Sequence, residues 1–214
     1  MKKIKVAFLL DSTNSWIEKG LRAFNFGLKK KYIYKITKNT KIKKQDIVFP
    51  LCYTKILSEN FLKSNKMVLI VHPSKLPQNK GFASIQYEIL KNKKKFFVSL
   101  IKATKKVDAG PICSQEYFTL NGTELLDEIR QKQQSIYFKM IKKFLSKYPK
   151  VKFRRQIGEG NFNKKRHSKD SKLDINKTIK SQFNLLRINH NELYPSFFKF
   201  KNNKFVIKIY KSKK

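Results

Sequence analysis

The sequence is poor in several features whose scarcity excludes whole classes of protein. It has two cysteines, Cys52 and Cys113, without the paired spacing of a zinc site or of a disulfide framework, and we predict that both are reduced core residues. No stretch approaches the roughly 18–20 apolar residues of a membrane span. The apolar run after the basic start ends at Asp11 with no small-residue cleavage site behind it. We therefore expect a first strand rather than a signal peptide, and a cytoplasmic protein.

Acidic residues and arginines are also scarce. The chain has 14 Asp and Glu against 50 Lys and Arg, a net charge of +36, yet only six of the basic residues are arginine. Such an excess is typical of proteins that bind nucleic acid or an anionic membrane, but arginine is the preferred reader of phosphates and bases. The lysines are spread along the whole chain. We interpret most of the charge as compositional bias on solvated surfaces, so a nucleic-acid partner stays open but is not favoured, and no membrane partner is expected.

Glycine is rare as well, and the chain shows a regular alternation of predicted strands and helices instead of glycine-rich loops. The chain has seven glycines, none of them in a loop directly after the first predicted strand, which argues against a dinucleotide fingerprint. Apolar patterns predict strands at 4–10, 32–37, 46–51, 67–71, 96–102 and 111–120, with helices between them at 17–28, 54–64, 83–91 and about 123–147. This alternation predicts an α/β fold with a mostly parallel sheet in residues 1–150.

Residues 151–214 have a different character. A basic stretch, 152–172, is predicted to be a surface loop, and it is followed by a helix over 178–188 and a hairpin over 197–209. We expect a small carboxyl-terminal helix-plus-hairpin portion.

One predicted strand ends in a residue with useful chemistry. The buried run 67–71 ends at His72, and the carboxyl ends of strands are where open α/β sheets bind ligands. Asp108 lies 36 residues further on, in a turn before Gly110. Either residue alone is compatible with a structural role, since Asp is common in turns. Together at one sheet edge, a histidine and an aspartate make a proton-handling pair.

These stretches resemble a known family. His72-Pro-Ser-Lys-Leu-Pro77, then Gly81, then Val107-Asp108-Ala109-Gly110 resembles the formyltransferase superfamily that uses 10-formyltetrahydrofolate, which includes glycinamide-ribonucleotide, methionyl-tRNA and nucleotide-sugar formyltransferases. The resemblance implies a Rossmann-like catalytic domain, 10-formyltetrahydrofolate as cosubstrate and no metal. His72 would stabilise or protonate the oxyanion of a tetrahedral intermediate, and Asp108 would orient His72 and help to take the proton of the attacking amine. Tyr53, Ser74 and Val107 would contact the cosubstrate.

The carboxyl-terminal third resembles one branch of this family. Arg166 to Asp174 and Asn191-Glu192-Leu-Tyr194-Pro195 are similar to the enzymes that formylate 4-amino sugars on a nucleotide carrier, and about 40 residues after Asp174 are too few for the extra β-barrel of methionyl-tRNA formyltransferases. This implies a nucleotide-linked 4-amino-4,6-dideoxy sugar as substrate, with 151–214 completing its site. Lys80 would meet the pyrophosphate, Gly81 would let the backbone approach the ligand, and Asn191, Glu192 and Tyr194 would hold the nucleotide. A homodimer stays open.

The chain departs from the family pattern at two positions. Ile70 stands where the superfamily usually has an asparagine, and Phe82 stands where the sugar branch prefers tryptophan. Loss of one oxyanion donor typically costs about 10²–10³ in rate. Two alternatives therefore stay open: an RNA-binding or inactive protein on this fold, and a formyltransferase for another amine such as methionyl-tRNA.

Overall fold

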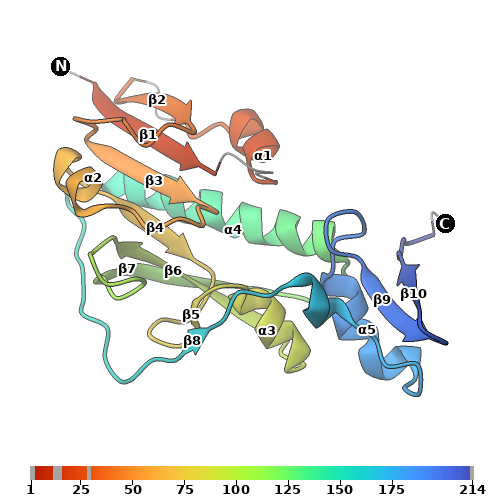
Figure 1. The fold of residues 1–214 in the computed structure, drawn as a ribbon. Coiled ribbons are helices and arrows are strands. Elements are labelled where there is room, and N and C mark those ends of the chain that lie inside the picture. Colours follow the sequence, from red (N-terminus) through yellow and green to blue (C-terminus); the bar gives the residue numbers. More distant parts are fainter. Residues whose placement is uncertain (1–2, 12–15, 28–29, 213–214) are drawn as a thin grey trace.

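The computed structural model describes residues 3–11, 16–27 and 30–212. Six strands lie side by side in the order β2-β1-β3-β4-β6-β7 (Figure 1), since two three-stranded sheets meet where Val48 of β3 and Val68 beside β4 form a parallel bridge. Their bounds are Tyr32–Thr37, Ile4–Leu10, Ile47–Leu51, Leu69–His72, Lys95–Lys102 and Ile112–Thr119, in that spatial order. The first four are parallel, whereas β6 and β7 each run antiparallel to their neighbour. The predicted α/β fold with a parallel sheet is confirmed.

Helices cover both faces of the sheet. α1 (Glu18–Ala23) and α4 (Leu126–Lys147) pack with the apolar residues of the sheet on one face, in the largest core cluster. α2 (Glu59–Ser64) packs on the other face, over Ala7, Leu9 and Val48. α3 (Ser84–Leu90) joins α4 and α5 (Ile179–Ile188) in a smaller cluster beyond β6. Apolar residues of α4 belong to both clusters, so one side of this longest helix is core.

Several predicted boundaries were wrong for local reasons. The helix expected from 54 begins only at Glu59, where the Ser58 hydroxyl accepts the Phe61 N–H, because Thr54 is hydrogen-bonded to Asp11 across the sheet edge. The longest helix, expected from about 123, begins only at Leu126 as α4. The Glu128 carboxylate accepts the Leu125 N–H there. Residues 12–15, directly before the first predicted helix, and Leu28 at its end lie outside the described residues.

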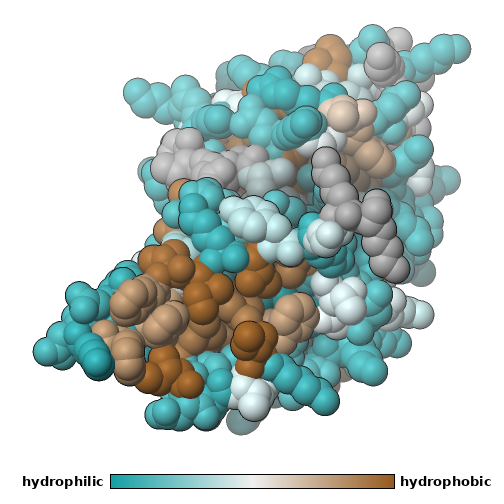
Figure 2. Space-filling view, turned by 90° about the vertical axis from the view of Figure 1, so that its right-hand side faces the viewer, coloured by the Kyte–Doolittle hydropathy of each residue, from teal (hydrophilic) through white to brown (hydrophobic). Residues whose placement is uncertain are grey.

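The carboxyl-terminal helix and hairpin are present as predicted. They are α5 (Ile179–Ile188), β9 (Ser196–Phe200) and β10 (Asn203–Ile207). Only the start of β9 is buried, where Ser196 accepts a hydrogen bond from Asn189 and Phe197 pairs with the 172–173 backbone. Further out, Phe200, Phe205 and Val206 are about half exposed, and Figure 2, which faces this side, shows apolar side chains gathered on it.

The basic stretch predicted as a surface loop is exposed but contains structure. It runs back along the molecule to β8 (Phe162–Asn163), which pairs in parallel with β5 (Lys80–Gly81), and then forms a 3₁₀ turn, η1 (Ser168–Ser171). The chain of 151–214 thus contacts the β4–α3 region directly. Among the described residues, no helix combines the length and apolarity needed to cross a membrane.

Candidate functional site

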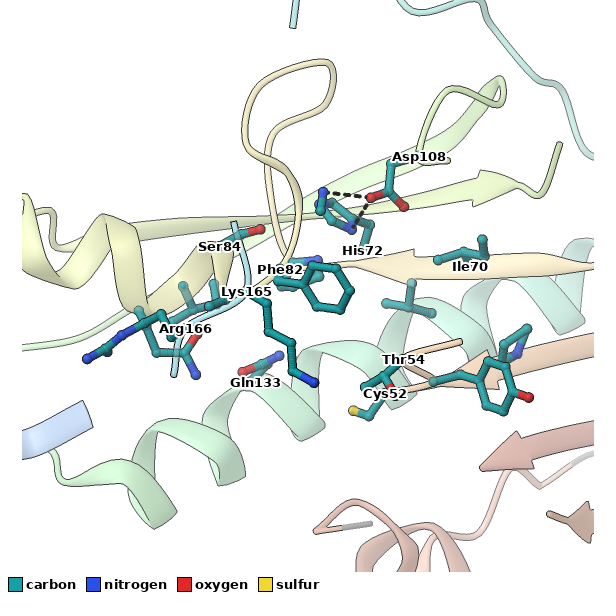
Figure 3. A pocket seen from close by; sticks show the side chains of 18 of the residues that line it. Cys52, Thr54, Ile70, His72, Phe82, Ser84, Asp108, Gln133, Lys165 and Arg166 are labelled. Atoms are coloured by element: carbon teal, nitrogen blue, oxygen red, sulfur yellow. Dashed lines mark hydrogen bonds and ion pairs between the residues drawn. The ribbon is translucent and has the colours of Figure 1, made fainter. Parts of the chain in front are cut away.

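A cavity of about 800 Å³ opens at the carboxyl edge of the parallel strands. Its walls come from the chain after β3, the end of β4, the β5–α3 turn, the first half of α4 and the stretch around η1 (Figure 3). This is the edge at which open α/β sheets bind ligands, because helices and loops leave a crevice there.

His72 and Asp108 meet in the wall of this cavity. His72 is the last residue of β4 and Asp108 lies in the turn before β7, and they are 5% and 7% exposed. His72 Nδ1 lies 3.4 Å from Asp108 Oδ2, and that same oxygen accepts the Gly81 N–H at 2.9 Å. The contact expected from the order of the motifs is present, and it faces the cavity.

The second ring nitrogen of His72 also faces an acceptor. His72 Nε2 lies 3.0 Å from the Asn79 carbonyl oxygen, which accepts the Ser84 hydroxyl as well. A carbonyl can only accept, so Nε2 is the donor of that bond. Nδ1 then faces a carboxylate, and a hydrogen bond between them requires one further proton, on the ring or on Asp108. The geometry is compatible with the proton-handling role that the sequence predicts for this pair.

The backbone around the site adopts unusual conformations. Cys52, Asn79, Ala83 and Asp108 have φ of 52°, 55°, 53° and 50°, in the left-handed region that side chains disfavour. Strained backbone of this kind clusters at functional sites, where the surrounding structure holds it in place. Here it turns the Asp108 side chain toward His72 and the Asn79 carbonyl toward the imidazole.

Ile70 occupies the same face of β4 as His72, two residues earlier, and it lines the cavity. Its side chain packs beside Leu76, Ile101 and Ile112. Asn65 does not replace the family asparagine, because its amide bonds to Phe61 and Gln45 at the end of α2. Phe82, at the tryptophan position of the sugar branch, lines the cavity and is 41% exposed.

Four of the predicted binding residues lie in the cavity wall. They are Tyr53, Gly81, Val107 and Tyr194. Gly81 has φ of +83°, and a Cβ there would lie 2.7 Å from the Asn163 carbonyl oxygen. The close backbone approach to β8 therefore already requires glycine at this position, and the approach to a ligand that the sequence suggested stays a prediction.

The other four predicted binding residues point elsewhere and do not line the cavity. The Ser74 hydroxyl donates to the Gln78 carbonyl within its own turn. Lys80 Nζ lies over the Phe162 ring, 5.7 Å from its centroid. Asn191 bonds the Ile209 backbone, and Glu192 forms an exposed ion pair with Lys208. The roles that the sequence suggested for these side chains have no geometric support.

Several cavity residues were missed by the sequence interpretation. Arg130 of α4 donates to the Tyr194 hydroxyl at 3.3 Å, and its guanidinium lies 5.7 Å from the Trp16 ring centroid. Gln133, one turn further along α4, and Lys165 also line the cavity, and Figure 3 shows the Lys165 side chain reaching into it. A signal was present: polar residues at i and i+3 interrupt the apolar stripe of α4, and arginine is rare in this chain.

Cys52 lies in the wall near Arg130. Burial raises the pKa of its thiol to about 12, although the guanidinium acts in the opposite direction. The thiol is therefore protonated at neutral pH and a poor nucleophile. The other two histidines differ from each other: His167 borders the cavity and is exposed, whereas His190 Nδ1 accepts the Glu192 and Leu193 N–H groups.

Comparison with known families accounts for this arrangement. Residues 7–143, well over half of the chain, match the model of the formyl transferase family. The chain belongs to the formyl transferase family. It is 34% identical over 124 residues to the methionyl-tRNA formyltransferase of Mycoplasma genitalium, an alignment that covers 56% of this chain and 39% of that protein. The chain thus spans about two fifths of the length of this curated relative.

Solved structures share the fold across almost the whole chain. A methionyl-tRNA formyltransferase from Clostridium thermocellum has a TM-score of 0.83 at 20% identity, with 98% of this chain and 94% of that one covered. A likely sugar N-formyltransferase, Rv3404c from Mycobacterium tuberculosis, has a TM-score of 0.73 at 16% identity, with 99% of each covered. HypX from Aquifex aeolicus, solved with tetrahydrofolic acid, has a TM-score of 0.76 at 14% identity over 97% of this chain and 38% of that one.

Proposed function

We propose that this chain transfers a formyl group from 10-formyltetrahydrofolate to the amine of a nucleotide-linked 4-amino-4,6-dideoxy sugar. The observation that carries the proposal is the contact between His72 and Asp108 at 3.4 Å, in the wall of a cavity at the carboxyl edge of the sheet. Family membership and a structural relative bound to tetrahydrofolic acid support the donor.

The chemistry assigned to the pair follows from its hydrogen bonds. The substrate amine attacks the formyl carbon, a new C–N bond forms, and the carbonyl oxygen becomes an oxyanion. The bond from this carbon to N10 of the folate then breaks, and N10 leaves with a proton. The proton lost by the amine passes to the His72–Asp108 pair, and the pair returns one to N10. Positioned proton transfer of this kind contributes about 10²–10⁴ in rate.

The outer half of the cavity is the proposed place of the nucleotide sugar. Arg130 and Lys165 bring positive charge to a cavity that also contains the Trp16 and Tyr194 rings. A pyrophosphate would meet the cations, and a base would stack on an aromatic ring. Of the residues first assigned to this substrate, Gly81 and Tyr194 remain in the proposal, with Tyr53 and Val107 on the folate side.

Methionyl-tRNA is the second candidate acceptor. The sequence relative from Mycoplasma genitalium carries that name, and the net charge of +36 suits a polyanion. Both candidate acceptors contain phosphate as well as a primary amine, so the positive charge of the protein does not distinguish between them.

The test is mass spectrometry of reactions that contain 10-formyltetrahydrofolate with a panel of nucleotide-linked 4-amino sugars, or with methionyl-tRNA. We expect a gain of one formyl mass on a nucleotide sugar. Formylation of methionyl-tRNA alone would replace the sugar by the second candidate. No transfer to any acceptor, with saturable and salt-sensitive RNA binding, would favour the inactive RNA-binding alternative.

A further inference from the structure

The linker between α4 and η1 contacts both catalytic loops. We name residues 154–163 the linker brace. Its first residue, Arg154, exchanges two backbone hydrogen bonds with Ile112 at 2.7 and 2.9 Å. Its last two residues form β8 and pair with β5, which contains the Gly81 N–H bonded to Asp108. The linker brace is thus anchored at both ends, next to the two turns that carry the catalytic pair.

Gln156 holds the turn that carries Asp108. Its amide nitrogen donates to the carbonyl oxygens of Asp108 and Gly110, both at 2.8 Å. These carbonyls lie on either side of Ala109, so Gln156 fixes the turn in which Asp108 has a positive φ. The amide oxygen of Gln156 is buried without a partner among the described residues. Burying an acceptor without a partner is unfavourable, and a residue that served only as a solvated loop position would not incur this cost.

Asn161 holds the turn that bonds His72. Its side-chain oxygen accepts the Asn79 N–H at 2.9 Å, and its amide nitrogen lies 3.3 Å from Asn79 Oδ1. The carbonyl of Asn79 is the acceptor of His72 Nε2. Gly160 permits this approach, because a Cβ at that position would lie 2.1 Å from the Pro77 carbonyl oxygen.

We propose that Gln156 and Asn161 are positioning residues for formyl transfer, each holding the acceptor of a different His72 ring nitrogen. Gln156 holds Asp108 at Nδ1, and Asn161 holds the Asn79 carbonyl at Nε2. This inference rests on the proposed function for its catalytic consequence, but the hydrogen bonds of His72 can be measured without any reaction.

The test compares Gln156→Leu and Asn161→Ala with Ile157→Ala, a control whose side chain is 84% exposed in the same segment. Gln156→Leu removes the unpaired oxygen, but it also takes the donor away from the Asp108 and Gly110 carbonyl oxygens, so the melting temperature of each variant is measured to establish that it folds. We expect kcat to fall about 10- to 100-fold in each brace variant, with KM nearly unchanged, because a small misplacement of reacting groups has effects of this size. The control should match the unmodified protein.

Nitrogen-15 spectra of the imidazole rings provide the second readout. The chain has three histidines, so assignment needs only His167 and His190 variants. Gln156→Leu should move mainly the Nδ1 signal of His72, and Asn161→Ala mainly the Nε2 signal. Unchanged His72 signals and kcat in both folded variants would overturn the proposal. If the unmodified protein transfers no formyl group, the proposed function fails, while the spectra still decide the role of the linker brace.

Discussion

The two ends of the cavity are built differently. At the proposed catalytic end, His72 and Asp108 are nearly inaccessible, and backbone groups of Asn79 and Gly81 hold them in place. At the outer end, Arg130, Tyr194 and Lys165 are long side chains that are partly or largely exposed. If the proposed function holds, the chemistry depends on a rigid frame, whereas recognition depends on side chains that can adapt to the ligand.

The largest effect should come from the catalytic end. His72→Asn and Asp108→Asn preserve approximate size and should each lower kcat about 10²–10⁴-fold, because they remove proton transfer from the transition state. Steady-state formyl transfer measures this, with melting temperature as the control for folding. A loss below about tenfold in both variants would place the proton-handling groups elsewhere.

Ile70→Asn tests whether the catalytic end lacks a donor. An amide at this position, on the same face as His72, should raise kcat toward the 10²–10³-fold that one oxyanion donor is worth. Removing the aliphatic side chain from its contacts with Leu76 and Ile112 should lower the melting temperature. The control is Ile70→Leu, which keeps the apolar contact. A large loss of activity in Ile70→Asn alone would mean that the site is built around isoleucine.

Glu124 lies outside the cavity, in the turn before α4, and its carboxylate tests how the start of that helix is held in place. Burial raises the pKa of Glu124, but hydrogen bonds from Lys132 and from the Asn121 and Gly122 N–H groups outweigh it, so the pKa falls from 4.5 to about 2. A carboxylate with a lowered pKa stabilises the fold above pH 4.5, and this stabilisation is lost as the pH falls from 4.5 toward 2. It is worth on the order of 3 kcal/mol.

Glu124→Gln should therefore lower the free energy of unfolding at pH 7 and flatten its fall between pH 4.5 and 2. Urea unfolding across this range measures both. Glu116→Gln is the matched control, because Glu116 has one exposed lysine partner, Lys143, and exposed pairs contribute little. If the free energy of unfolding falls in the same way between pH 4.5 and 2 in both variants, the stabilisation does not come from Glu124.

The smallest effect concerns recognition. Tyr194→Phe removes the hydroxyl that accepts from Arg130, and it should raise KM for the nucleotide sugar about 3- to 10-fold without changing kcat, since one hydrogen bond to a charged group is at stake. Glu192→Gln should change neither constant, because Glu192 pairs with Lys208 away from the cavity. A larger rise in KM for Glu192→Gln than for Tyr194→Phe would contradict this assignment. A fall in kcat for Tyr194→Phe would contradict it as well.

The same division explains what the sequence could predict. His72 ends a strand and Asp108 lies in the turn between two strands, each in a recognisable motif, so their placement follows from local pattern and sheet topology. Asn191 and Glu192 belong to an equally recognisable run, but the contacts that turn them toward Ile209 and Lys208 come from the chain after β10. Gln156 gave no local signal, because its partners are about 46–48 residues away in the sequence. The spacing of apolar residues along the sequence gives no information about long-range hydrogen bonds of exposed segments.

The long return path of the linker brace has a consequence for the order of folding. The bonds from Gln78 to Glu159 and from Asn79 to Asn161 close loops of 81 and 82 residues. Closing such loops is entropically slow compared with forming local contacts. We expect the sheet and α4 to form first, and the catalytic geometry to mature only once this segment docks. In refolding experiments, recovery of the His72 imidazole signals should therefore lag behind recovery of the far-ultraviolet circular dichroism.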